Sequence, residues 1–325
     1  MKCTNKIRMC IATLAVCMVL TGCGNVSYTF KYNPDSSVSS FRIVNTEMQD
    51  TASTFAEDLC VVSEDIMPED VDMTSVSAAA LFDVDNGEVL YAKNVYEKLH
   101  PASLTKVLTA LVALKYGNPN DILTASENVK ISESGAQLCG VKPGDSMTLD
   151  QALHILLMYS ANDVAVMIAE HIGGSVDGFA TMMNEEAKRI GATNSNFVNP
   201  HGLTDDSHYV TAYDMYLIFN EAVKYDLFTE IIHMASYDTV YHDAAGNEKE
   251  ISVKSTNWYL NDTCVMPEKV TVIGGKTGTT TAARHCLVLL SKDTAGQPYI
   301  SVILSAESRD ILYAQMTELL GEIRK

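Results

Sequence analysis

The order of local patterns along this chain constrains its fold more than any single motif does. Two strand-like segments, 76–84 and 88–94, flank Asp85-Asn86-Gly87, and an Asn-Gly pair between apolar runs predicts a β-hairpin. Strand-like patterns return only after about 130 residues of helical character. The helical stretch is therefore expected to be an insert between the first and the later strands of one sheet.

Helical periodicity, with apolar residues three and four apart, fills the middle of the chain in segments 104–114, 149–160, 163–172 and 175–192. Strand signals follow at 269–278, 285–292 and 298–306, and a last helix is expected over 309–324. This order predicts a mixed α/β (α+β) fold: a five-stranded, mainly antiparallel sheet with packed helices and a helical lobe beside it. A cleft is expected between the two lobes.

The N-terminus has the pattern of an export signal. A basic start to Arg8 precedes twelve mostly apolar residues, Met9 to Leu20, too few to span a bilayer as a mature helix. Leu-Thr-Gly-Cys at 20–23 resembles the lipobox of bacterial lipoproteins, which implies cleavage of residues 1–22 and lipid attachment to Cys23. The expected location is the extracytoplasmic face of the cell membrane; an uncleaved signal anchor or a plain secretory signal is the alternative.

Residues 24–75 carry ten acidic and two basic side chains without a sustained period, which predicts a flexible acidic linker over 23–75. Its r.m.s. span would be roughly 35 to 45 Å. The folded domain is expected over 76–325. The net charge of −18, or −21 without residues 1–22, argues against nucleic acid as a partner.

Cysteine usage predicts no structural metal. Without the signal, the chain keeps Cys23 and four scattered cysteines, and none of them has metal-ligand spacing: Cys60, Cys139, Cys264 and Cys286. An extracytoplasmic location would permit disulfides, but single buried thiols fit the wide spacing at least as well.

A serine and a lysine stand three residues apart at the start of an otherwise apolar helix, at Ser103 and Lys106. On a helix they share one face, so the amine can accept the serine proton and make the hydroxyl a nucleophile. Burial near a second cation would favour the neutral amine that this requires. Backbone N–H groups at the helix start could stabilise the negative charge that develops on an attacked carbonyl.

The pair alone is a weak signal, because Ser-x-x-Lys is common by chance. Two further sparse motifs follow in order: Ser-Ala-Asn at 160–162 after an apolar helix, and Lys-Thr-Gly at 276–278 at the end of a strand-like run. With them, the chain resembles the penicillin-binding proteins and serine β-lactamases, specifically the low-molecular-weight D-alanyl-D-alanine carboxypeptidases. Similar stretches include GEVLYAKN, VKPGDSMTLDQAL, SANDVAVMIAEHIGGS and NFVNPHGL.

The resemblance implies catalytic roles for three residues and no cofactor. Ser103 would attack the carbonyl of the penultimate D-alanine of a peptidoglycan stem peptide, while Lys106 takes its proton. Ser160 would relay a proton to the leaving nitrogen. β-Lactams would acylate the same serine as inhibitors.

The resemblance also implies a set of substrate-binding residues. Asn162 would hydrogen-bond the substrate peptide and Lys106, and Lys276 would supply the second cation. Thr277 would meet the terminal carboxylate, Gly278 would leave room for the peptide, and the backbone N–H of Thr279 would join that of Ser103 in an oxyanion hole. Arg309 would help to hold the carboxylate, with a surface charge at a helix start as its alternative.

Three other functions remain open at this point. A β-lactamase of the closest layout places a deacylating glutamate after the serine motif, but no glutamate lies between Glu186 and Glu221, and the second motif is not Ser-Asp-Asn. An endopeptidase or transpeptidase would use the same acyl-enzyme. A binding lipoprotein without turnover would not need both Lys106 and Ser160.

No catalytic role is predicted for the histidines and the one tyrosine near the motifs. His201 is expected to shape the cleft rather than to act as a base, and His154 and His285 are expected to be ordinary residues of the fold. Tyr159 stands where this family often has a proline or a small residue, and the sequence assigns it no role.

Overall fold

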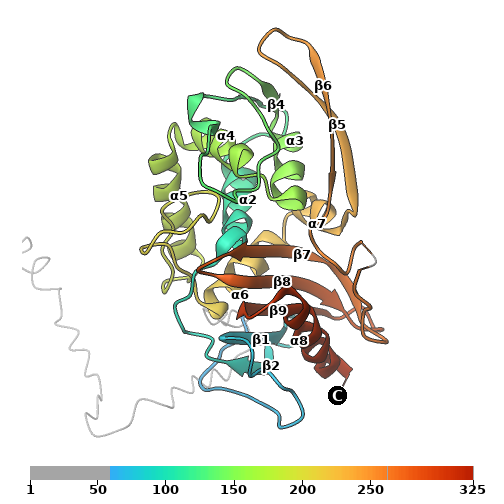
Figure 1. The fold of residues 1–325 in the computed structure, drawn as a ribbon. Helices are drawn as coiled ribbons and strands as arrows, with labels where there is room; N and C mark the ends of the chain where they lie inside the picture. The colour runs from blue at the N-terminus through green and yellow to red at the C-terminus, as the bar shows by residue number, and fades with distance from the viewer. Residues whose placement is uncertain (1–58, 262, 325) are drawn as a thin grey trace, which may run out of the picture. The chain divides into compact units, whose positions relative to one another are not determined.

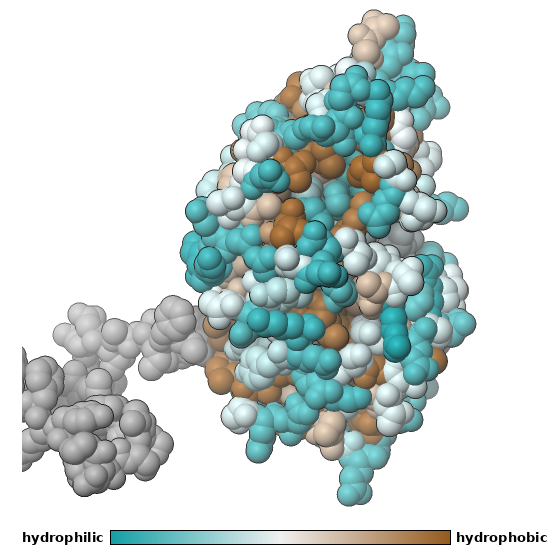
Figure 2. Space-filling model, turned by 60° about the vertical axis from the view of Figure 1, so that its left-hand side comes forward, coloured by the Kyte–Doolittle hydropathy of each residue, from teal (hydrophilic) through white to brown (hydrophobic). Residues whose placement is uncertain are grey.

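A computed structural model describes residues 59–261 and 263–324 of the chain. The predicted signal, Cys23 and the linker up to residue 58 lie outside the described residues. Figure 1 shows a sheet with helices on both of its faces and a helical lobe above it. The space-filling view in Figure 2 shows a mostly hydrophilic face with apolar side chains in small patches.

The five-stranded sheet is the one predicted. It consists of β1 (Ala78–Asp83), β2 (Glu88–Lys93), β7 (Thr271–Thr280), β8 (Arg284–Lys292) and β9 (Pro298–Ala306). The spatial order is β2-β1-β9-β8-β7, and the paired neighbours are antiparallel. Central strands such as β8 are buried on both faces, so they read as continuous apolar runs rather than alternating ones.

Helices cover the sheet and form the lobe beside it. In chain order they are η1 (Ala102–Leu104), α2 (Thr105–Tyr116), η2 (Glu127–Val129), α3 (Leu149–His154), the π-helix η3 (Ile155–Tyr159), α4 (Asn162–Gly173), α5 (Val176–Arg189), α6 (Ala212–Ala222), α7 (Asp226–His233), α8 (Arg309–Gly321) and η4 (Glu322–Arg324). The insert and the closing helix are thus confirmed.

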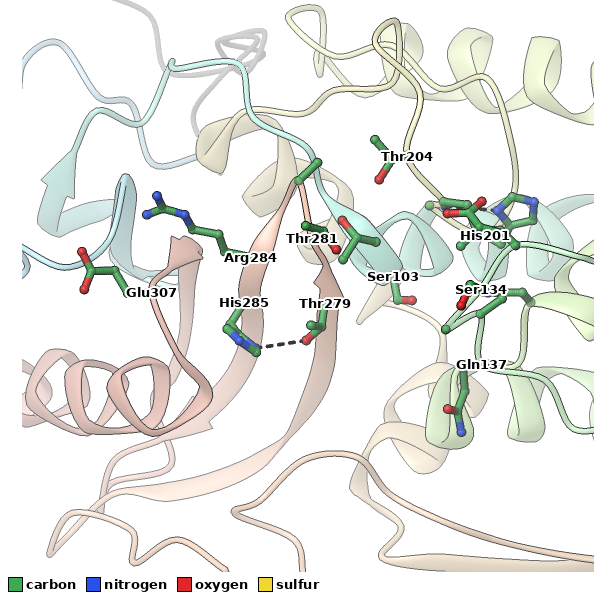
Figure 3. Close-up of a pocket in the computed structure, with 18 residues that line it drawn as sticks. Ser103, Ser134, Gln137, His201, Thr204, Thr279, Thr281, Arg284, His285 and Glu307 are labelled. Atoms are coloured by element: carbon green, nitrogen blue, oxygen red, sulfur yellow. Dashed lines mark hydrogen bonds between the residues drawn. The ribbon is translucent and has the colours of Figure 1, made fainter.

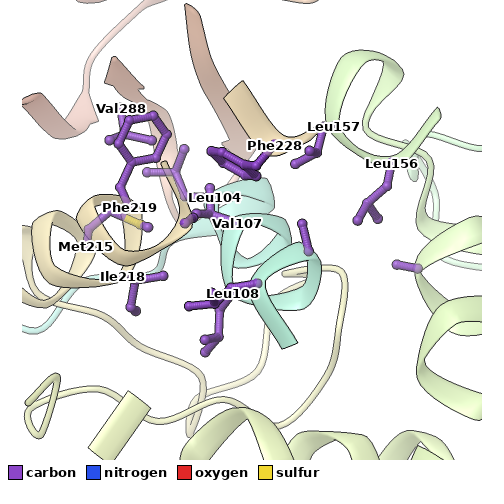
Figure 4. Packing of buried hydrophobic residues seen from close by; sticks show 14 of the residues in the cluster. Leu104, Val107, Leu108, Leu156, Leu157, Met215, Ile218, Phe219, Phe228 and Val288 are labelled. Carbon is purple, nitrogen blue, oxygen red and sulfur yellow. The ribbon is translucent and has the colours of Figure 1, made fainter. Parts of the chain in front are cut away.

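Helix α2 is the central helix of the core. Its residues 105–113 are all buried, so the helix is covered on every side rather than on one face. In Figure 4, Leu104, Val107 and Leu108 point toward side chains of α6 and the sheet, among them Phe219 and Val288. Because this helix carries Lys106, the lysine is buried by the packing of its whole helix.

The predicted start of the folded domain at Val76 is wrong. Cys60 is 0% exposed and Met73 3%, and Ile66 exchanges two backbone hydrogen bonds with Ala92 of β2, at 2.7 and 2.8 Å. Lys93 Nζ donates to the carbonyls of Met73 and Val76. Isolated apolar anchors hold residues 59–75 on the domain, and they give no periodic signal among the exposed acidic residues.

A second sheet was not predicted. Its strands are β3 (Ile122–Thr124), β4 (Ser146–Thr148), β5 (Ser236–His242) and β6 (Glu248–Lys254), in the order β3-β4-β5-β6. Strand β5 alternates exposed and half-buried residues, so the period of two was present in the sequence. Its residues are polar enough that the segment reads as a loop, although Gly246 at φ +83° marks the hairpin turn.

The four cysteines of the domain are free thiols. Cys60 and Cys286 are buried, whereas Cys139 and Cys264 are partly exposed. Across residues 59–261 and 263–324, no helix combines the length and the apolar character needed to cross a membrane.

Candidate active site

Ser103 and Lys106 lie where the helical lobe meets the sheet. Ser103 is in the 3-10 turn that leads into α2, and Lys106 Nζ lies 3.0 Å from its Oγ. The same nitrogen donates to Asn162 Oδ1 at 2.6 Å and to the His201 carbonyl at 2.7 Å. The amine, fully buried, therefore has three oxygen partners, and one of them is the serine hydroxyl.

The surroundings of Lys106 favour its neutral form. Burial lowers its pKa well below the usual value, the charge of Lys276 lowers it further, and Asp163 opposes the shift. A neutral amine has two N–H groups, which match the carbonyls of Asn162 and His201, and one lone pair, which faces Ser103 Oγ. This is the hydrogen-bond pattern of a general base that can accept the serine proton.

Ser160 and Lys276 form a second hydroxyl and amine pair. Lys276 Nζ lies 3.0 Å from Ser160 Oγ and 2.9 Å from the Thr277 carbonyl. Burial lowers the pKa of Lys276 to about 7, so the group can exchange a proton near neutral pH. Ser160 follows the π-helix η3 and has a left-handed backbone, with φ +70°.

Strand β7 forms the opposite wall of the site. The Thr277 hydroxyl lies 2.6 Å from that of Thr256, which sequence reasoning did not single out. Thr279 is exposed in the cleft, and its Oγ1 lies 3.3 Å from His285 Nδ1 (Figure 3). His285 therefore lines the cleft.

Gly278 packs against the turn that carries Ser103. A Cβ at this position would lie 2.8 Å from the Pro101 carbonyl oxygen and 3.2 Å from Leu104 N. The missing side chain thus makes room for η1, and the room that it is expected to leave for a bound peptide stays a prediction. The close approach brings the backbone of β7 directly against the turn that carries Ser103.

Arg309 is at the head of α8 but does not line the cavity. Its guanidinium lies 5.7 Å from the centre of the Trp258 ring, and its charge adds to burial in lowering the pKa of His285. Arg284 does line the cavity, and in Figure 3 it points away from Ser103, on the same side as Glu307. The predicted contact of Arg309 with a carboxylate stays a prediction.

His201 and Tyr159 contribute to the structure around the site. Burial, aided by the charge of Lys106, lowers the pKa of the His201 ring to about 3, so this ring is uncharged at neutral pH. His201 contributes its carbonyl to Lys106, as expected for a residue that shapes the site. Tyr159, at the end of η3, packs against the hydrophobic cluster that contains α2. The ring of His154 stacks on that of Tyr237, with ring centroids 4.1 Å apart.

The cavity above Ser103 has a volume of about 800 Å³. Three segments that are distant in sequence line it: 133–137, 201–204 and 279–285 except Ala283, together with Ser103, Asn162 and Glu307. In Figure 3, Ser134 and Gln137 lie on one side of Ser103, and Thr279 and His285 lie on the other. The space can accommodate an extended peptide between the helical lobe and β7.

Gly202 holds the loop of His201 against the serine turn. Its φ is +86°, and a Cβ there would lie 1.8 Å from the Ala102 carbonyl oxygen. Gly202→Ala is expected to lower the Tm by at least about 4 °C more than Gly246→Ala, measured by thermal unfolding. Gly246 is the matched control, because its φ is +83° and its Cβ would contact nothing within 4 Å. Equal Tm changes in the two variants would contradict this packing role.

The fold and the site together define a class of protein. The antiparallel sheet with an inserted helical lobe is that of the Streptomyces K15 DD-transpeptidase, with a TM-score of 0.71 at 23% identity over 78% of this chain and 98% of that chain. A penicillin-binding protein homolog from Mycobacterium tuberculosis gives a TM-score of 0.68 at 28% identity, over 78% of this chain and 93% of that one. The class is that of the proteins with the DD-transpeptidase fold, with a serine and lysine pair where the sheet meets the helical lobe.

The comparison of sequences defines the family more narrowly. The profile of the D-alanyl-D-alanine carboxypeptidase family, peptidase S11, matches residues 65–308, and the chain belongs to this family. DacF of Bacillus subtilis is 34% identical over 247 residues, 75% of this chain and 60% of the relative. DacC of Escherichia coli is 31% identical over 261 residues, 77% of this chain and 62% of the relative. The chain thus spans less than two thirds of these two curated relatives.

Proposed function

We propose that this protein is a serine-type D-Ala-D-Ala carboxypeptidase that removes the terminal D-alanine from peptidoglycan stem pentapeptides. The observation that carries the proposal is the buried Lys106 amine 3.0 Å from Ser103 Oγ, inside a cavity of about 800 Å³. DacF and DacC, to which the chain is similar, are both named D-alanyl-D-alanine carboxypeptidases.

Acylation starts at Ser103. Its Oγ attacks the carbonyl carbon of the penultimate D-alanine, and the hydroxyl proton passes to Lys106 Nζ. Backbone N–H groups of Ser103 and Thr279 stabilise the oxyanion, where Gly278 lets β7 meet the serine turn.

Departure of D-alanine requires a proton on its nitrogen. Ser160 relays to this nitrogen the proton that Lys106 took from Ser103, so Lys106 becomes neutral again, and Lys276, 3.0 Å from Ser160 Oγ, orients that hydroxyl. The terminal carboxylate lies beside the Thr277 hydroxyl and the Lys276 charge. Water then attacks the ester at Ser103, with Lys106 as base, and releases the shortened peptide.

The ion pairs of Glu186 favour slow deacylation of β-lactams. Glu186, the last glutamate before Glu221, is buried in ion pairs with Lys115 and Arg189, at 2.6 Å each. It is therefore not free to activate a deacylating water. A penicillin that acylates Ser103 is expected to remain attached for long enough to inhibit the enzyme.

The test is to incubate the purified protein with a pentapeptide that ends in D-Ala-D-Ala and to measure free D-alanine. Release that stops after a stoichiometric amount of penicillin supports the proposal. Stable penicillin attachment without any D-alanine release would instead indicate a binding protein, and rapid penicillin consumption would indicate a β-lactamase.

The proposal extends to the cell surface through Cys23. The resemblance of residues 20–23 to a lipobox implies a lipid anchor on the extracytoplasmic face of the membrane, with an acidic arm toward the wall polymer. Cys23→Ala is expected to move the protein from the membrane fraction to the soluble or secreted fraction, measured by fractionation and lipid labelling. A Cys60→Ala control should remain lipid-labelled in the membrane fraction. Unchanged membrane attachment of the Cys23 variant would contradict the anchor.

A further inference from the structure

A buried carboxylate, that of Asp163, lies beside the site. Asp163 is 1% exposed and follows Asn162 in the first turn of α4. Its two oxygens accept backbone N–H groups from three consecutive residues, Cys139 at 3.2 Å, Gly140 at 2.8 Å and Val141 at 3.3 Å. Charge-assisted hydrogen bonds of this kind hold a loop more firmly than neutral ones.

The loop that Asp163 holds is a wall of the cleft. Residues 133–137 line the cavity, and Figure 3 places Ser134 and Gln137 across Ser103 from Thr279. The Gln137 carbonyl accepts the backbone N–H of Asn162 at 2.8 Å. The head of α4 therefore binds this loop at two points, and the same residue pair, Asn162 and Asp163, contacts both Lys106 and the wall.

The charge of Asp163 also acts on the catalytic amine. It raises the pKa of Lys106, against the larger effects of burial and of Lys276. Four other titratable groups near these residues are uncharged at neutral pH. Burial lowers the pKa of the His201 ring to about 3 and that of His208 to about 4; it raises the pKa of the Cys139 thiol to about 12 and also that of the Tyr241 phenol.

We propose that Asp163 is a positioning residue of the active site, which fixes the 133–141 loop as the helical-lobe wall of the cleft and places a negative charge near Lys106. The inference rests on the proposed function, because the wall matters only if a peptide or penicillin lies against it. Two consequences follow: a looser wall slows acylation, and a lost charge lets Lys106 stay neutral at lower pH.

Asp163→Asn separates this role from a purely structural one. We expect the second-order rate constant of penicillin acylation to fall by about 10- to 100-fold at its plateau. The acid limb of its pH profile should move to lower pH, since the neighbouring negative charge is gone. The measurement is acylation followed across pH, together with D-alanine release and a thermal melt of each variant.

Two further variants make the test specific. Asp145→Asn is the matched control: Asp145 is 5% exposed in the same lobe and accepts the Lys142 N–H at 2.9 Å, but its charge is not among those that shift Lys106. It should change acylation by less than about 3-fold and leave the acid limb in place. Asp163→Glu keeps the charge and displaces the carboxylate, so acylation should slow without a move of the acid limb, even if Asp163→Asn does not fold.

The outcomes distinguish the inference from the proposed function. If Asp163→Asn folds and matches Asp145→Asn in rate and in acid limb, or if Asp163→Glu acylates at the parent rate, the positioning role is wrong. If the parent protein itself neither binds penicillin covalently nor releases D-alanine, the proposed function fails, whatever the variants do.

Discussion

Replacing Ser103 by alanine is expected to abolish both D-alanine release and penicillin labelling. The substitution removes only the Oγ atom, so the attacked carbonyl has no nucleophile and no acyl-enzyme can form. Loss of a serine nucleophile lowers kcat on the order of 10⁶-fold in serine peptidases, which is below detection here. Lys106 keeps its bonds to Asn162 Oδ1 and the His201 carbonyl, so the fold should be retained.

The measurement is D-alanine release alongside mass spectrometry of a penicillin adduct. Ser291→Ala is the matched control, because it removes a serine hydroxyl in β8 that does not line this cavity. The control should keep both activities. Penicillin labelling of the Ser103 variant at the parent rate would place the nucleophile elsewhere and overturn the mechanism.

Replacing Lys106 by arginine is expected to reduce acylation by about 10²- to 10⁴-fold. A guanidinium stays protonated at all accessible pH values, so it cannot accept the Ser103 proton. It is also larger than the amine that fits between Ser103 Oγ, Asn162 Oδ1 and the His201 carbonyl. Lys106→Met, which is uncharged and cannot accept the proton either, should lose activity to a similar extent.

The acylation rate of the parent protein is expected to fall at low pH, because Lys106 must be neutral to act. Burial and Lys276 lower the pKa of Lys106, so the neutral base exists at neutral pH and the parent rate falls only as the pH drops through that lowered value. The acylation rate of both variants should lose this acid limb. Acylation by Lys106→Met at more than about a tenth of the parent rate would show that another group is the base.

Most of the proposed catalytic residues could be predicted from the sequence, because their motifs are local. Ser103 and Lys106 are three residues apart, and helical geometry alone places them on one face. The first hairpin, the late strands and the closing helix also follow from periods within short windows. The three sparse motifs in order supplied the resemblance to the family that the comparisons then established.

Other features had a weak local signal or none. Residues 59–75 pack on the domain through isolated anchors such as Cys60 and Met73, and an acidic composition hides them. The β5 and β6 hairpin is only half buried, so its alternation is weak in hydrophobicity. The sequence identified Gly278 and Arg309 as candidates, but the groups that they contact belong to segments that are distant in the sequence.

The sequence by itself determined the five-stranded antiparallel sheet, its helical insert, and the identity of the serine and the two lysines, since these depend on spacing and on short apolar patterns. Only the tertiary structure decided what those residues are chemically. Lys106 has the lowered pKa that a base requires because packing buries its entire helix and brings Asn162, 56 residues away, and Lys276 around its nitrogen. A pKa is a property of everything that surrounds a group in space, and no local pattern encodes those surroundings.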